Sequence, residues 1–416
     1  MFPNPQDALP LPSRPSLEQY KKLAKDLVKT AASSDRSALR TWAVNWLKNL
    51  VQLANLQATD RLPINAGQLP AEFESFVRKQ ESDGKLSLSK AQFVLARSHG
   101  FESWPKFSRH LDALAHADSS EADFEKAADV IVGGQLDDLT RLLRKNPDLV
   151  RARSTREHRG TLLHYVAANG VEGYRQKTPG NVVQIARLLL DSGAEVDAEA
   201  DVYGGGSTTL ELAATSVHPE RAGVQEALMQ LLIDRGATEK PAASHGRTLV
   251  SVCLANGRKR AAEFLAARGF RIDLEAAAGL GRLDLVTKLF ADATKKQRES
   301  ALCWACEHGS IDSVHFLLDQ AVSIHPIVSG ETALHWAVVG GHIDIIHLLL
   351  SHGADLEAKN VYGGTALGQA VWCVMNTESD DEYLKVIEAL IEAGAVIDSH
   401  MREWLAAQAK KRESIS

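Results

Sequence analysis

Two polar segments contain the residues best suited to chemistry in this sequence. The first, TSVHPERAG at 215–223, places a histidine, a carboxylate and a guanidinium within four residues. The second, VEGYRQKTPGN at 171–181, adds a tyrosine, an arginine and a lysine. An arginine presents two parallel donors to a carboxylate or phosphate, so these segments could bind an anion. The structural alternative is that Pro219 shapes a turn and its charged neighbours cap or pair with an adjacent helix.

Other patterns that suggest chemistry are better explained by structure. Cys303 and Cys306 imitate a redox C-x-x-C, but they fall inside a helical segment, without a strand-to-helix turn that would lower a thiol pKa. No Ser–His–acid order, phosphate-binding loop or nucleotide fingerprint occurs. The glycines at 204–206 are too few for such a loop and are typical of a turn. No catalytic residue, metal site or cofactor is therefore predicted.

The elements that would position these residues follow from an internal repeat. Residues 330–358 read GETALHWAVVGGHIDIIHLLLSHGADLEA, and Thr365 begins the same phrase 33 residues after Thr332. Apolar residues recur with helical spacing in two short runs of each unit. The phrase closely resembles the ankyrin repeat, in a form typical of bacterial proteins with a helical region before the repeats. The resemblance implies an all-α solenoid of about eight helix-turn-helix units with a helical N-terminal domain. It explains His335, His342 and His352 without a metal, because the ankyrin pattern itself carries histidine there.

Irregular spacing marks where the repeats depart from the pattern. Thr161 and Thr208 are 47 residues apart, and Thr208 and Thr248 are 40 apart, against about 33 in the family. Insertions in such arrays map to one face, which often binds ligands. Because the extra residues lie in adjacent repeats, we expect their polar side chains to be neighbours in space. The residues of this predicted patch are Tyr174, Arg175, Lys177, His218, Glu220 and Arg221.

The sequence also predicts where the domains begin and end and in which compartment the protein resides. We expect an extended leader at 1–15, a helical domain at 16–115, a linker at 116–123, repeats at 124–400, and a capping helix and tail at 401–416. Residues 1–115 hold 16 Lys and Arg against 11 Asp and Glu. This small excess is typical of solvated helix faces and makes nucleic-acid binding unlikely. No apolar run approaches the ~20 residues of a membrane helix, and four cysteines give no disulfide framework, which favours a cytoplasmic protein.

The resemblance favours a non-enzymatic scaffold that binds a protein partner through a concave groove and finger loops. Two finger tips carry Tyr203 and Tyr362, and the ring of each either projects toward a ligand or lies back on its own repeat. Asn169, Glu211 and Thr215 fall at or beside groove positions that the family varies. The alternative is a small-molecule-binding or catalytic site built from 171–181 and 203–223. Its residues would be His164, Tyr165, Tyr203, Glu211, His218, Glu220 and Arg221.

Overall fold

The computed structural model describes residues 4–35, 37–54, 68–240, 247–376, 380–397 and 401–404. The chain divides into two compact units, Met1–Leu249 and Val250–Ser416. The predicted boundary between the helical domain and the repeats therefore falls inside the first unit, and the division between units falls within the repeats. Within the described ranges, every helix is too short or too polar to cross a bilayer.

The first unit begins with the predicted helical domain. Its helices are α1 (Leu17–Ala31), α2 (Ala38–Leu53), α3 (Leu69–Gln80), α4 (Leu88–Ser98) and α5 (Trp104–Leu114). Each buries one apolar face, and Trp42, Trp46 and Phe73 pack together where α2 meets α3. Pro105 lies in the first turn of α5, where its missing N–H costs nothing.

Part of the predicted leader belongs to the helical domain. After a short 3-10 helix η1 (Pro5–Asp7), Leu9 is fully buried in the same core as α1–α4. The Leu9 N–H donates to the Ser98 carbonyl over 2.7 Å, and His99 Nδ1 donates to the Leu9 carbonyl over 3.0 Å. The domain therefore starts earlier than residue 16, because buried backbone groups of the leader find their partners at the end of α4.

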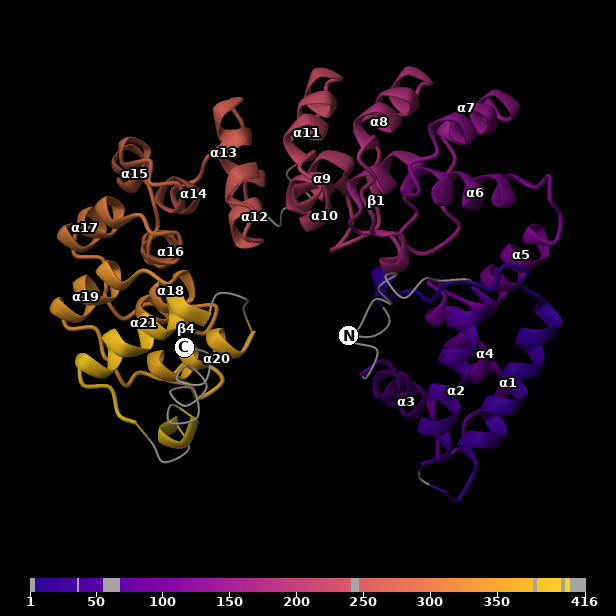
Figure 1. The fold of residues 1–416 in the computed structure, drawn as a ribbon, viewed down its shortest axis with the longest axis horizontal. Coiled ribbons are helices and arrows are strands. Elements are labelled where there is room, and N and C mark those ends of the chain that lie inside the picture. The colour runs from indigo at the N-terminus through magenta and orange to yellow at the C-terminus, as the bar shows by residue number, and fades with distance from the viewer. Residues whose placement is uncertain are drawn as a thin grey trace, which may run out of the picture. The chain divides into compact units, whose positions relative to one another are not determined.

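The repeats form eight helix pairs within the described residues, which confirms the predicted architecture (Figure 1). The first helix of the second pair is 3-10 rather than α. The pairs are α6 (Ser120–Val132) with α7 (Leu136–Lys145), η3 (Leu162–Ala167) with α8 (Val182–Asp191), α9 (Thr209–Thr215) with α11 (Gln225–Asp234), α12 (Leu249–Ala255) with α13 (Lys259–Ala267), α14 (Leu274–Gly279) with α15 (Leu283–Phe290), α16 (Lys295–Glu307) with α17 (Ile311–Asp319), α18 (Ala333–Gly340) with α19 (Ile343–Ser351), and α20 (Ala366–Asn376) with α21 (Asp380–Glu392).

The remaining elements are short and sit in the connections. They are η2 (Pro147–Val150), η4 (Gly173–Arg175) and α10 (Val217–Arg221). Two antiparallel hairpins add the only strands of the described residues, β1 (Glu199–Ala200) with β2 (Ser207–Thr208) and β3 (Ile327–Val328) with β4 (Glu331–Thr332). The predicted linker is shorter than 116–123, since α5 ends at Leu114 and α6 begins at Ser120.

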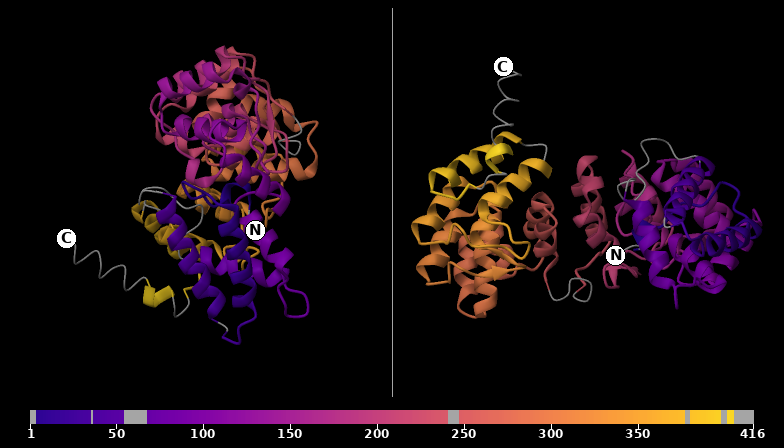
Figure 2. Two further views of the ribbon diagram at one scale, coloured as in Figure 1. Left: turned by 90° about the vertical axis from the view of Figure 1, so that its right-hand side faces the viewer. Right: turned by 90° about the horizontal axis from the view of Figure 1, so that it is seen from below.

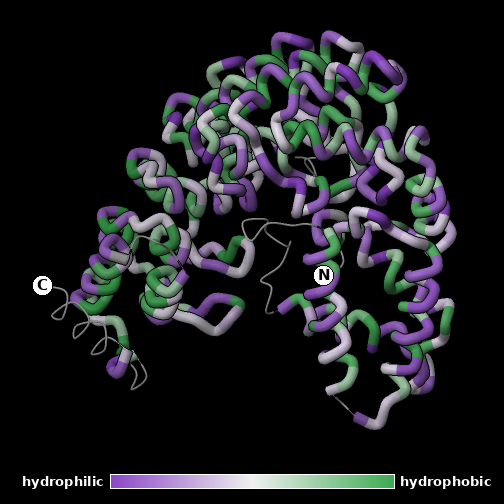
Figure 3. The backbone as a smooth tube through the Cα atoms, turned by 45° about the vertical axis from the view of Figure 1, so that its right-hand side comes forward, coloured by the Kyte–Doolittle hydropathy of each residue, from purple (hydrophilic) through white to green (hydrophobic). Residues whose placement is uncertain are grey.

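Two helix layers organise the second unit. The first helices α14, α16, α18 and α20 pack in succession, and the second helices α15, α17, α19 and α21 do the same behind them (Figure 2, right, orange to yellow). Hydrophobic residues recur along these helices between hydrophilic ones (Figure 3), so each pair buries its apolar side only by stacking on the next. Met401 and Trp404 pack against the same core, and residues 405–416 of the predicted cap lie outside the described residues.

Candidate partner-binding surface

The first hairpin tip brings three of the predicted residues together. Tyr203 sits between β1 and β2 with φ +52°, an uncommon conformation for a bulky residue, and the three glycines after it also have positive φ. The Tyr203 hydroxyl donates to Asn169 Oδ1 over 2.6 Å, and Asn169 Nδ2 donates to Thr215 Oγ1 over 3.1 Å. Tyr203 is 50% exposed, so its ring rests partly on the preceding repeat and partly faces solvent.

Glu211 has a structural role that the sequence analysis did not assign to it. It is buried, and its Oε2 accepts the backbone N–H of Thr208 over 3.0 Å, which closes a capping box at the start of α9. His164 does the same in the preceding repeat, where its Nδ1 accepts the Thr161 N–H over 3.0 Å. Burial raises the pKa of Glu211 to about 7. Glu211 and His164 are therefore helix caps rather than ligand-facing groups.

The first insertion folds inward, which corrects the prediction for two residues. Tyr174 and Arg175 lie on η4, which packs against α6, and both side chains are buried. Arg175 Nε donates to Asp129 Oδ1 over 2.8 Å, and Arg175 Nη1 lies 2.8 Å from Glu125 Oε2. The guanidinium is thus neutralised by carboxylates of α6 and does not form a surface anion site. Lys177, two residues later, is exposed.

Arg175 belongs to a buried ionic cluster that sequence reasoning missed. Glu172 is fully buried, and its Oε1 lies 3.0 Å from Arg156 Nη1 and 3.4 Å from Arg175 Nη1. The Tyr165 hydroxyl donates to the same oxygen over 3.4 Å. Arg156 also pairs with Glu125. Two arginines and two glutamates therefore alternate in the interior, with Asp129 at the rim.

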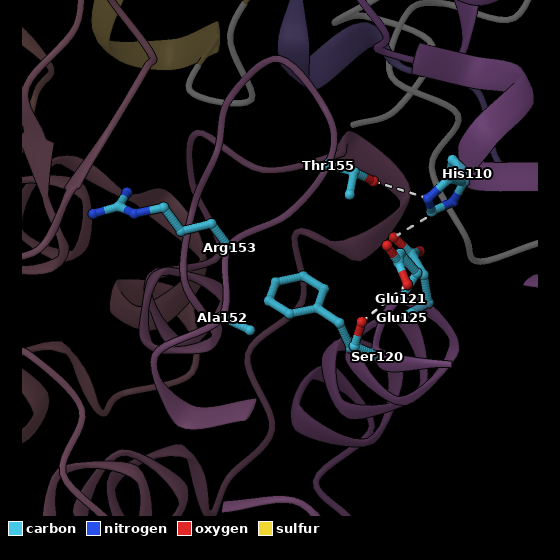
Figure 4. A pocket seen from close by; sticks show the side chains of 8 residues that line it. His110, Ser120, Glu121, Glu125, Ala152, Arg153 and Thr155 are labelled. Carbon is cyan, nitrogen blue, oxygen red and sulfur yellow. Dashed lines mark hydrogen bonds and ion pairs between the residues drawn. The ribbon is translucent and has the colours of Figure 1, made fainter. Parts of the chain in front are cut away.

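The charges of this cluster hold one another ionised. Burial opposes ionisation of Glu125, but the guanidinium groups of Arg156 and Arg175 outweigh it and lower its pKa to about 2. The same balance keeps the pKa of Glu172 well below its usual range. A small cavity of about 70 Å³ adjoins Glu125 and is lined by His110 and Thr155 (Figure 4). It is large enough for a few water molecules, and His110 Nδ1 is already within 2.8 Å of Thr155 Oγ1.

The cluster also ties the helical domain to the repeats. The loop that carries Arg156 binds the end of α4, where the Glu157 N–H donates to the Gly100 carbonyl over 2.8 Å and Arg97 pairs with Glu157. Arg156 lies over the Phe101 ring, 5.5 Å from its centroid. The one sequence signal was the charge density of STREHRG at 154–160, directly before the apolar run TLLHYVAA.

The second insertion forms the short helix α10, which packs against α11. Ser216 caps it by accepting the His218 N–H over 3.3 Å, and Pro219 is buried. His218 and Glu220 are half-buried and Arg221 is exposed. Because η4 packs against α6 while α10 packs against α11, the predicted patch does not form as a unit. The alternative small-molecule site is not formed as predicted either, since His164, Tyr165 and Glu211 are buried and do not face a ligand.

The second unit presents the more exposed of the two tyrosines, in the loop between α19 and α20. Tyr362 is 88% exposed. Its backbone N–H donates to Asn360 Oδ1 over 3.0 Å, and that oxygen also accepts the Gly364 N–H over 2.9 Å. Asn360 Nδ2 donates to Glu331 Oε1 over 3.1 Å, so a buried amide fixes the backbone of the tip. The His335 Nε2–H donates to the Gly364 carbonyl over 3.1 Å, which joins this tip to the preceding repeat.

The residues that imitate redox and metal sites are structural. Cys303 and Cys306 are buried on α16, and burial raises the pKa of both thiols. His342 Nε2 donates to the Glu307 carbonyl of the preceding repeat over 3.1 Å. Within the described ranges, His, Cys, Asp and Glu side chains nowhere gather in threes as a metal ion would need.

A protein-family model and a solved structure each match part of this chain. The family model for ankyrin repeats (three copies) matches residues 274–360 and 329–401. Residues 274–401 are therefore ankyrin repeats, and the earlier helix pairs continue the same mostly helical architecture. Among solved structures, the human ASB11 ankyrin repeat domain is similar at 22% identity and a TM-score of 0.36, over 65% of this chain and 98% of that one. Among curated proteins, no significant match was found.

Proposed function

We propose that this protein is a scaffold that binds a protein partner through the hairpin tips and the first-helix layer of its ankyrin repeats. Ankyrin repeats are generally protein–protein interaction modules, and stacked repeats create extended binding surfaces. The observation that carries the proposal is Tyr362. Its ring is almost fully exposed on a backbone held by Asn360, so it offers contact area at a low cost in conformational entropy.

Tyr203 offers a second contact of a different kind. Its hydroxyl is already bonded to Asn169, so the exposed part of the side chain would make mainly apolar contact. Asn169 and Thr215 extend this contact along the first helices of their repeats. The function needs no covalent chemistry. The setting we propose is a bacterial cytoplasm, and the four cysteines, which are buried and form no disulfide, favour a reducing compartment.

Affinity capture from a native lysate, read by mass spectrometry, tests the scaffold function. The wild type would be compared with Tyr203→Ala/Tyr362→Ala and with Leu283→Ala, which removes an exposed apolar side chain from the second-helix layer. We expect a protein retained by the wild type and by Leu283→Ala and lost by the folded double variant. If the double variant retains the partner as well as the wild type does, the tips do not bind it. If none of the three proteins enriches a partner, the scaffold function is refuted.

A further inference from the structure

Five large apolar side chains lie exposed at one end of the second unit. They belong to the β3–β4 hairpin, to the tip of the next repeat's loop at 360–364 and to the helix α20 that follows it, and each is more than half exposed. We name them together the finger surface: Ile327, Val361, Tyr362, Trp372 and Met375. Exposed apolar side chains that gather in this way mark interaction sites, unlike single ones scattered over a surface.

Contacts between the two tips make this surface continuous. The Val361 N–H donates to the Gly330 carbonyl over 3.0 Å. A Cβ placed on Gly330 would lie 2.3 Å from Val361 Cγ1, so the valine side chain sits directly over the glycine of the β3–β4 tip. Ile327 opens that same hairpin. The apolar side chains of the two tips are therefore neighbours.

The surface continues from the second tip along α20. Asn360 Nδ2 lies 3.4 Å from Gln369 Oε1, which joins the tip to the first turns of the helix. Trp372 and Met375 follow Gln369 at helical spacings of three, so all three share one face of α20. The opposite face is buried in the core. The β3–β4 hairpin, the loop at 360–364 and α20 thus contribute exposed apolar side chains that one partner could contact.

The segment of chain that carries the finger surface is strongly acidic. Residues 323–397 contain ten Asp and Glu against two Lys and no Arg, a net charge of −8. An open hollow of about 650 Å³ lies where α19 and α21 begin, beyond the C-terminal ends of α18 and α20, and it is lined by Asp344, Asp381 and Glu382. Lys385 and His342 also line it. Such a field attracts cations and repels nucleic acid and acidic proteins.

From this combination we infer that the finger surface binds a cationic amphipathic segment of a partner protein. The inference rests on the proposed scaffold function and names its partner class. Apolar side chains of the segment would pack against Tyr362 and Trp372, which provide the aromatic anchors typical of binding hot spots. Lysine or arginine side chains of the segment would face the acidic hollow and speed association.

Fluorescence anisotropy on the full-length protein tests the partner class. The probe is a fluorescein-labelled amphipathic peptide of leucine and lysine, with a leucine and glutamate peptide of the same pattern as its counterpart. We expect the wild type and Leu283→Ala to bind the lysine peptide equally, and Tyr362→Ala/Trp372→Ala to bind it about tenfold more weakly or worse. Affinity should fall as salt rises, and less steeply in Asp344→Asn/Glu382→Gln.

Three results would overturn the inference: no binding of the lysine peptide by the wild type, equal binding of the glutamate peptide, or unchanged binding by Tyr362→Ala/Trp372→Ala. Circular dichroism establishes that each variant is folded, as the exposure of both aromatic side chains leads us to expect. The capture experiment remains independent of these results. A captured partner that requires Tyr362 but binds through an acidic or neutral segment would keep the scaffold function and remove only the partner class.

Discussion

Removing one buried charge should destabilise the first unit strongly. Glu172→Gln keeps the shape of the side chain but leaves Arg156 and Arg175 with one buried carboxylate between them. At an effective dielectric constant of about 20, a contact near 3 Å between unit charges is worth about 5 kcal/mol. The desolvation of the carboxylate cancels part of that gain, so we expect a net loss of about 3–5 kcal/mol in the free energy of unfolding.

Urea unfolding followed by circular dichroism measures this loss, and hydrogen exchange identifies the segment that opens. In hydrogen exchange, the loss should appear as faster exchange in α6, the 154–159 loop and η4, which the cluster joins. Glu18→Gln is the matched control, because Glu18 pairs with Lys21 at an exposed site of the same unit and should leave the transition unchanged. An unfolding transition of Glu172→Gln at the wild-type urea concentration would refute the reasoning.

A second variant separates lost charge balance from lost packing. Glu172→Gln/Arg156→Met removes one charge of each sign and leaves Arg175 with Glu125 and Asp129. Because the unpaired buried charge is gone, the double variant should be less destabilised than the sum of its two single variants. Strict additivity would mean that the two side chains do not interact in the folded state.

Three further outcomes are expected. Gly340→Ala should destabilise the second unit by about 1–3 kcal/mol in urea unfolding, since its Cβ would lie 2.2 Å from the Glu307 carbonyl oxygen, whereas Gly180→Ala has open space and should be neutral. Asn360→Ala should cost about 1–3 kcal/mol and increase hydrogen exchange at the Tyr362 tip, because two backbone N–H groups lose their acceptor. Acid should weaken the fold below about pH 6.5, because burial lowers the pKa of several histidines while the unfolded chain takes up protons at the usual pH. The free energies of unfolding measured with urea at about pH 7.5 and 5 should differ by up to about 1.4 kcal/mol for each histidine and each pH unit below about 6.5, and equal free energies would contradict this. The histidines with pKa lowered to about 4 are His110, His164 and His308.

The loss of stability below about pH 4.5 has a separate cause. The pKa of Glu125 lies near 2 in the folded protein, below its unfolded value, so the cluster contributes fully above about pH 4.5. That contribution disappears as the pH falls from about 4.5 toward 2 and the carboxylates take up protons. Glu172 acts in the same direction.

The sequence alone determined the repeat architecture, because helical apolar spacing and turn residues act within a few positions of one another. The phrase at 330–358 predicted α18 and α19, and the glycines at 204–206 predicted a turn where β1 meets β2. The burial of Cys303 and Cys306 followed from the same register. Local patterns were sufficient there, since each repeat packs only against its neighbours.

Only the tertiary structure decided what the polar insertions do. Arg175 and Asp129 are 46 residues apart in sequence, and Arg156 and Glu125 are 31 apart, so no local spacing shows that they pair. From the sequence, Arg175 was predicted to be a surface anion-binding residue, but in the structure its guanidinium pairs with carboxylates of α6. The sequence also did not determine how exposed the two tyrosines are. Tyr203 and Tyr362 occupy similar loop tips, but the Tyr203 hydroxyl donates to Asn169, which holds its ring against the preceding repeat, whereas the Tyr362 ring is almost fully exposed. A charge or ring takes its role from the partners that the fold brings to it, and those partners come from distant parts of the chain.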